Sequence, residues 1–144
     1  SAATDRDIVL YSYPYLSQQM FTREMQLQKR DELMGKLVKG KVDGTYMGTE
    51  YKHFPPEYNA LTVNKKYAGE LRGLWKMYGG ASMGGPFVAV SRLDELQQRV
   101  VTAETFIFAA GQKKRNALRQ SEAALYTLRL SDEVNSLEQV TIEN

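Results

Sequence analysis

The feature that most constrains the fold is a run of strand patterns joined by links too short for a crossover. Strands are predicted at Glu57–Val63, Tyr67–Met77, Phe87–Leu93 and Arg99–Ala109. Consecutive strands with short links pair antiparallel, because a parallel pair needs a crossover of a dozen or more residues. An apolar segment at 8–15 predicts one more strand, so we expect an antiparallel sheet.

The segment from Tyr67 to Met77 shows the clearest alternation. Its two faces differ in chemistry, with Tyr67, Leu71, Trp75 and Met77 on one side and Glu70, Arg72 and Lys76 on the other. Successive side chains of a strand point to opposite faces, so this pattern predicts one dry face and one wetter face. We expect Trp75 to be buried on the helix-covered side of the sheet, beside Leu71 and Leu125.

Two helices flank the run of strands. The first is predicted to begin after an N-cap at Thr22 and to stop at Gly40, and the second covers 112–130. The stretch 41–56 is rich in turn residues and is expected to be irregular. These patterns predict one α+β domain over 5–130, in the order β-α-β-β-β-β-α, with four to six strands and two main helices in layers. A polar tail follows at 131–144, and the sequence does not define its structure.

The glycine-rich stretch YGGASMGGPF, residues 78–87, invites a comparison with phosphate-binding loops. A Walker loop would need Lys and Ser or Thr where Gly85 and Pro86 stand, followed by a helix. A strand pattern follows instead. The stretch is therefore predicted to turn the chain and to bind no nucleotide.

Composition narrows the function further. The chain has 144 residues, a net charge of +2 and no cysteine. Disulfides, thiol nucleophiles and thiolate metal sites are excluded, and no histidine or carboxylate motif for a metal occurs. The basic residues do not gather on one predicted face, so we expect no binding to nucleic acid. We expect no cofactor and no metal.

The only histidine, His53, leaves one enzymatic hypothesis open. A hydrolase could use His53 with a nearby glutamate and a serine such as Ser12 or Ser82, or paired carboxylates such as Glu50 and Glu70. No nucleophile-elbow motif links these residues. A loop histidine packed against the neighbouring prolines is the preferred interpretation, so we expect no enzymatic activity.

Aromatic residues are the most unusual feature of the composition. Nine tyrosines, five phenylalanines and one tryptophan gather mainly in 11–15, 46–58 and 67–78. Tyrosine offers a large contact area with a polar tip, which suits protein or glycan surfaces, although such rings also fill strand faces. A ligand surface, if present, is expected to be formed by Tyr46, Glu50, Tyr51, His53, Glu70 and Arg72.

Several stretches together resemble a known family. They are YSYPY, FTREMQLQKRDELM, DGTYMGTEY, YAGELRGLWKM, MGGPFVAVSRLD and VTAETFIFAAGQKKRNALRQSEAALYTL. They are similar to an uncharacterised lipoprotein family of the Bacteroidetes, domain of unknown function 4837, over residues 8–130. The order of elements also resembles the Mog1/PsbP-type sandwich.

This resemblance implies an address and a class of function. Family members carry a lipoprotein signal and a further segment upstream, so it implies a longer, lipid-anchored parent protein in the bacterial cell envelope. It brings no catalytic or binding residues. Since relatives with a Mog1/PsbP-like fold act mostly in binding or assembly, we expect a non-enzymatic module that recognises an envelope protein or glycan. The sequence does not predict the oligomeric state.

Overall fold

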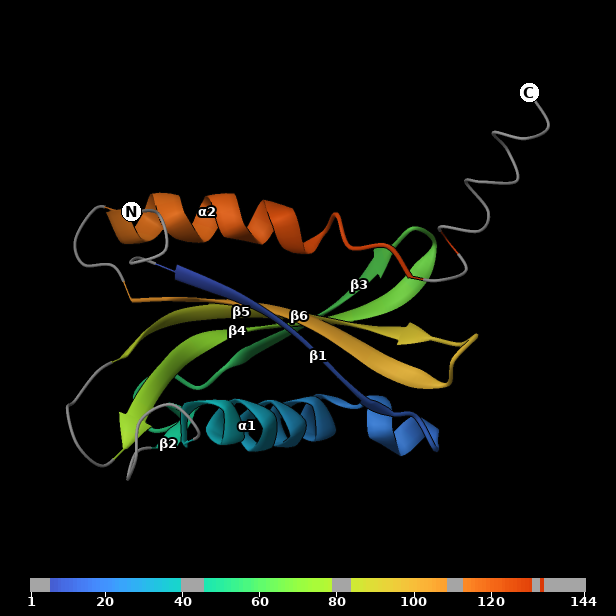
Figure 1. Ribbon diagram of the computed structural model, residues 1–144, viewed down its shortest axis with the longest axis horizontal. Helices are drawn as coiled ribbons and strands as arrows, with labels where there is room; N and C mark the ends of the chain where they lie inside the picture. Colours follow the sequence, from blue (N-terminus) through green and yellow to red (C-terminus); the bar gives the residue numbers. More distant parts are fainter. Residues whose placement is uncertain (1–5, 40–45, 79–83, 109–112, 131–132, 134–144) are drawn as a thin grey trace.

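The computed structural model describes residues 6–39, 46–78, 84–108, 113–130 and 133 (Figure 1). The elements in chain order are β1 (Arg6–Pro14), a 3-10 helix (Gln18–Phe21), α1 (Arg23–Lys39), β2 (Tyr46–Thr49), β3 (Glu57–Val63), β4 (Lys66–Tyr78), β5 (Gly84–Asp94), β6 (Arg99–Ile107) and α2 (Lys113–Leu125). Helix α1 lies on one face of the sheet and α2 on the other (Figure 1).

The strands form one six-stranded antiparallel sheet in the order β1-β6-β5-β4-β2, and β3 also pairs with β4. The long β4 has β3 beside its first half and β2 beside its last residues. The predicted α+β class and antiparallel sheet are confirmed, with one strand more than the predicted order.

The extra strand, β2, lies in the stretch that the sequence predicted to be irregular. It has only four residues, one of them a glycine, so its sequence carries too little alternation to be recognised. Its partners define it: Tyr46–Thr49 pairs with Trp75–Tyr78, and the Glu50 amide donates to the Leu74 carbonyl oxygen at 2.8 Å. Tertiary pairing, and not local propensity, makes this strand.

The glycine-rich stretch joins β4 to β5, and its residues 79–83 lie outside the described part. A strand, not a helix, begins at Gly84, as predicted. Neither Gly84 nor Gly85 adopts the left-handed conformation that often requires glycine. At Gly85 the reason for glycine is close approach, because an added Cβ would collide with the Ile107 carbonyl oxygen.

Each face of the sheet has its own core. The α1 face contains Leu27, Met34, Met47, Leu71, Trp75, Phe87, Ala89 and Phe106. The α2 face contains Ala68, Val88, Val90, Ala103 and Leu125. Both faces of β5 and β6 are therefore covered, which explains why apolar residues follow one another in both strands, as in Phe87–Val90.

Trp75 is the central aromatic residue of the α1 face. It is 3% exposed, its indole Nε1 donates to the Ile107 carbonyl oxygen at 2.9 Å, and its ring meets Phe106 edge-on at 5.9 Å between centroids. Its expected burial beside Leu71 is confirmed. The expectation of a contact with Leu125 is wrong, because Leu125 belongs to α2 and packs on the opposite face.

The helix ends depend on side-chain contacts. The Thr22 hydroxyl accepts from the Met25 amide at 3.2 Å and thus caps α1 as predicted. Helix α2 ends at Leu125, five residues before the predicted end. Beyond it, Arg92 donates to the Leu128 carbonyl oxygen at 3.0 Å and to the Glu133 carboxylate at 2.9 Å. Arg92 is buried, so this pair holds the segment after α2 against the sheet.

We expect Trp75→Ala to lower the free energy of unfolding by about 3–5 kcal/mol, because a buried ring leaves a cavity. Trp75→Phe should cost less, since it keeps the edge contact with Phe106 and loses only the hydrogen bond to the Ile107 carbonyl oxygen. Urea denaturation measures both, and Phe54→Ala, at a 61% exposed aromatic, is the matched control. A loss at Trp75 no larger than at Phe54 would contradict the packing described.

Acid should weaken the contact of Arg92 with Glu133. Burial alone would raise the pKa of Glu133, but hydrogen bonds from Arg92, the Leu130 amide and Asn64 outweigh it and lower the pKa to about 2. A depressed carboxyl pKa stabilises the fold above the ordinary value of 4.5, and this contribution is lost as the pH falls towards 2. Glu133→Gln should therefore flatten the dependence of stability on pH between these values, and an unchanged dependence would contradict this.

Candidate functional site

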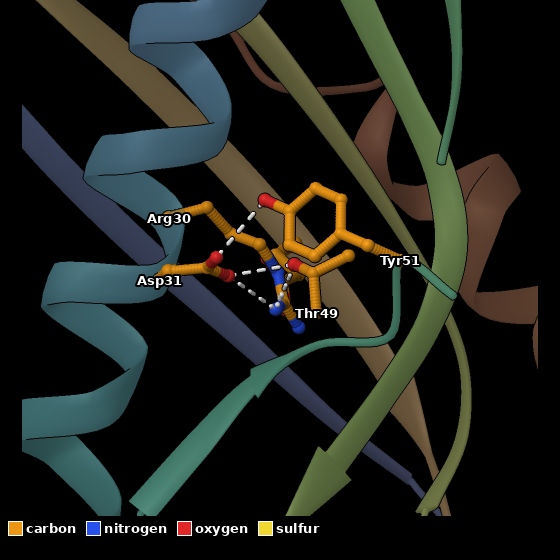
Figure 2. Close-up of polar contacts among 5 residues, drawn as sticks. Arg30, Asp31, Thr49 and Tyr51 are labelled. Atoms are coloured by element: carbon orange, nitrogen blue, oxygen red, sulfur yellow. Dashed lines mark hydrogen bonds and ion pairs between the residues drawn. The ribbon is translucent and has the colours of Figure 1, made fainter. Parts of the chain in front are cut away.

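A cluster of charged side chains lies between α1 and the sheet (Figure 2). Arg30 of α1 donates from Nε and Nη2 to the two carboxylate oxygens of Glu104 on β6, each at 2.9 Å. Both side chains have 0% exposed surface. Such a two-pronged pair satisfies both groups geometrically, as a buried ion pair requires.

The third nitrogen of Arg30 extends this cluster towards the surface. Nη1 donates to the Thr49 hydroxyl at 2.9 Å and to Asp31 at 3.2 Å. Asp31 in turn accepts from the Thr49 hydroxyl at 2.6 Å and from the Tyr51 hydroxyl at 3.1 Å. Figure 2 shows Arg30 and Asp31 projecting from α1 towards Thr49 and Tyr51. The guanidinium also stacks on the Phe87 ring, 3.8 Å from its centroid.

The electrostatics of this cluster fit a structural role. Burial raises the pKa of Glu104, and the Arg30 guanidinium opposes that rise. Burial disfavours the charged form of Arg30, yet the adjacent Glu104 carboxylate more than compensates and raises its pKa. Because neither side chain reaches solvent, the pair fastens α1 to β6 and offers no group to a ligand.

The sequence contains a signal for this cluster that the predictions above do not include. Arg30 stands between Leu27 and Met34, at the i+3 and i−4 positions of the apolar stripe of α1. Glu104 likewise lies in a strand with many apolar residues, between Ala103 and Phe106. A charge at a core position on each of two elements indicates a buried pair, since an unpaired charge there is costly.

An open groove of about 430 Å³ lies where the loop after β2, the end of β4, the start of β5 and the first turn of α2 meet. We call it the α2 groove. It is lined by Glu50, His53, Phe54, Leu74, Trp75, Lys76, Gly84, Gly85 and Lys114. Its chemistry combines one exposed aromatic ring, an imidazole, two ammonium groups and one carboxylate.

The carboxylate of the α2 groove serves the loop itself. Glu50 accepts from the Lys52 amide at 2.7 Å and from the His53 amide at 3.4 Å, and its oxygen lies 3.7 Å from Lys76 Nζ. The backbone hydrogen bonds, the Lys52 one above all, lower the pKa of Glu50. Glu50 thus shapes the turn that carries His53 and Phe54, both of them exposed.

Glu70 and Arg72, also expected at the ligand surface, do not line the α2 groove. Arg72 forms ion pairs with Glu70 and with Glu122 of α2. Glu70 also accepts from Tyr126 and Asn59. Although burial favours the protonated form of Glu70, these hydrogen bonds and Arg72 lower its pKa. This network joins β4 to the end of α2.

The six expected site residues therefore fall into separate places. Glu50 and His53 meet in the α2 groove, while Tyr51 turns to Asp31 on the α1 side. Glu70 and Arg72 pair with each other. The backbone of Tyr46 pairs with Tyr78, and its side chain lies outside the described part. Glu50 and His53 are three residues apart in one loop, so the sequence could predict that they lie close together. Their position relative to Glu70 and Arg72 depends on where that loop packs against the sheet, which the sequence does not show.

The described residues are 6–39, 46–78, 84–108, 113–130 and 133. They contain no group of three or more histidine or carboxylate side chains placed to hold a metal ion. Within the same residues, no helix combines the length and the apolar character needed to cross a bilayer.

The fold defines the class of this chain: it is an α+β sandwich with one helix on each face of an antiparallel sheet. Comparison of its sequence with known families gives a match over residues 1–127 to the Domain of unknown function (DUF4837). The chain belongs to this family. No significant match is found among curated proteins or among solved structures.

We expect Arg30→Met to lower the free energy of unfolding by about 3–5 kcal/mol, because it leaves the Glu104 carboxylate buried without a partner. Arg30→Met with Glu104→Leu should recover much of this loss, since no uncompensated charge remains. Lys36→Met, at an exposed cation of the same helix, is the control. Thermal and urea unfolding measure all three, and equal losses for Arg30→Met and Lys36→Met would contradict the structural role.

Proposed function

We propose that this chain is a non-enzymatic binding module and that its α2 groove recognises carboxylate-bearing chains of an envelope protein or glycan. The observation that carries the proposal is the convergence of Lys76 from β4, Lys114 from α2 and His53 from the loop after β2 on one open groove. Cationic and imidazole groups donate hydrogen bonds to carboxylates, and the exposed Phe54 ring adds an apolar contact.

The arrangement of carboxylates favours binding over the alternative, an envelope-polymer hydrolase. A glycosidase needs two carboxylates on either side of one bond, in one pocket. Among the described residues that line the α2 groove, Glu50 is the one carboxylate, and it is engaged with two backbone amides. Glu70 belongs to the separate network with Arg72 and Tyr126. His53 is thus better suited to contact a ligand than to catalyse hydrolysis.

The proposed address rests on the resemblance of the sequence to lipoproteins of the Bacteroidetes. In this proposal the module belongs to a longer parent protein, which reaches the membrane through a lipid anchor and faces the cell envelope. The likeness in element order to Mog1/PsbP-type binding and assembly factors supports the same class of function by analogy of fold.

Binding to two polymeric probes tests the groove. Polygalacturonate represents an acidic glycan and poly-glutamate an acidic peptide, with dextran and poly-glutamine as neutral controls. We expect saturable binding to one acidic probe, weakened by salt because the contacts are ionic. Lys76→Glu with Lys114→Glu should weaken it at least about tenfold, which corresponds to about 1.4 kcal/mol.

The matched control reverses the charge of two exposed lysines that lie outside the α2 groove, with Lys36→Glu and Lys65→Glu. This variant has the same net charge as the groove variant, so equal weakening by both would indicate unspecific attraction and contradict the groove. The acidic probe that binds distinguishes a glycan from a peptide ligand. Failure of both acidic probes to bind would also contradict the proposal.

A further inference from the structure

Strand β1 forms one edge of the sheet and is the longest edge strand among the described residues. All nine residues of β1 pair with β6 on one side, and no strand of the described chain pairs with the other side. The opposite edge of the sheet is different, since it is divided between the four-residue β2 and the seven-residue β3. Natural sheets shorten, bulge or charge their edges, or place Pro there, to prevent pairing. Strand β1 carries such residues only at its ends, Arg6 and Asp7 at its start and Pro14 at its last position, and the stretch from Ile8 to Tyr13 has none.

The side chains of β1 also expose apolar surface next to this edge. Ile8 is 50% and Leu10 is 62% exposed, and both point to the α2 face. Beside Leu10 lies a hollow of about 260 Å³, whose lining combines apolar side chains with two arginines: Leu10, Tyr11, Ser12, Arg99, Val101, Leu128, Arg129 and Leu130. Figure 1 shows β1, in dark blue, running along the sheet between the layers of α1 and α2. An exposed apolar strip along a free backbone edge is typical of a strand-pairing interface.

We propose that β1 is a homodimer interface, at which the β1 strands of two copies pair antiparallel and join the two sheets. Leu10 is the middle residue of β1, so only a two-fold axis at Leu10 pairs all nine residues. In that register Leu10 meets its own copy, Ile8 meets Ser12, and Asp7 meets Tyr13. The two Leu10 side chains then contact each other, and the strip of Ile8 and Leu10 continues across the interface.

Charge complementarity selects the same register and a second copy as the occupant. Asp7 and Tyr13 are six residues apart in β1 and point to the same face. The ammonium of Lys29 in α1 lies 5.6 Å from the centre of the Tyr13 ring on that face, and 3.8 Å from a carboxylate oxygen of Glu32 in the same helix. A copy paired through Leu10 therefore brings its exposed Asp7 next to Tyr13 and Lys29, and the two-fold axis repeats this contact. Residues 8–14 carry no charged side chain, so no like charges face each other across this part of the two paired strands.

Cysteine cross-linking tests the register directly, because the chain contains no cysteine. Across an antiparallel pair, facing Cα atoms lie about 4.5–5.5 Å apart, within the range that a disulfide spans. We expect Leu10→Cys to form a covalent dimer under mild oxidation. Ile8→Cys should cross-link poorly, because the two copies of residue 8 would lie about 13 Å apart along the strands.

Leu96→Cys is the control for exposure, since Leu96 is 62% exposed, as Leu10 is, but lies in the β5–β6 link. Cross-linking of Leu10→Cys no faster than Leu96→Cys, or cross-linking of Ile8→Cys as fast as Leu10→Cys, would overturn the proposal. So would a wild-type chain that sediments as a monomer at every concentration. This interface is independent of the α2 groove, and groove variants should leave the cross-linking unchanged.

A charge exchange provides a second test that does not depend on oxidation. Asp7→Lys should weaken the dimer, because it places Lys next to Lys29 of the other copy. Adding Lys29→Asp should restore it, which a purely local effect on folding would not do. Sedimentation velocity measures association and thermal unfolding confirms that each variant folds. A double variant no more dimeric than Asp7→Lys alone would contradict the register.

Discussion

The buried ion pair between Arg30 and Glu104 is the constraint on which the rest of the architecture depends. Glu104 lies on β6, inside the sheet and beneath α1, where a carboxylate without a partner would be costly. Arg30 must therefore lie above it, which fixes both the rotation and the position of α1. The remaining nitrogen of Arg30 then binds Thr49 and so places β2. The turn held by Glu50 follows directly, and with it one wall of the α2 groove.

The role of this ion pair in placing α1 explains why charged residues stand at two core positions that apolar residues could fill. A buried ion pair contributes little net stability compared with apolar residues of similar volume, because desolvation offsets the attraction. Its geometry is demanding, however, and the contacts of Arg30 with Glu104, Asp31 and Thr49 are met together in one placement of α1. We infer that the pair selects this placement of the helix over others that the apolar stripe of Leu27 and Met34 would allow.

The sequence predicted those parts of the fold that local periodicity encodes. Alternation in 67–77 and the short links identified β3 to β6 and their antiparallel pairing, and Thr22 marked the start of α1. Strand β2 was not predicted, because four residues are too few to show an alternation of polar and apolar side chains. The contact expected between Trp75 and Leu125 failed because alternation separates the faces of a strand without saying which helix covers each. The candidate site was predictable only within one loop, at Glu50 and His53.

The most direct measurement of the central claim is native-state hydrogen exchange of the wild-type chain. If the pair of Arg30 with Glu104 makes α1 and the sheet one cooperative unit, the amides around Arg30 must open only together with those around Glu104. We expect equal opening free energies, within about 0.5 kcal/mol, for Leu27–Met34 of α1 and Thr102–Phe106 of β6. Opening of α1 at more than about 1 kcal/mol below β6, with the sheet still protected, would contradict it.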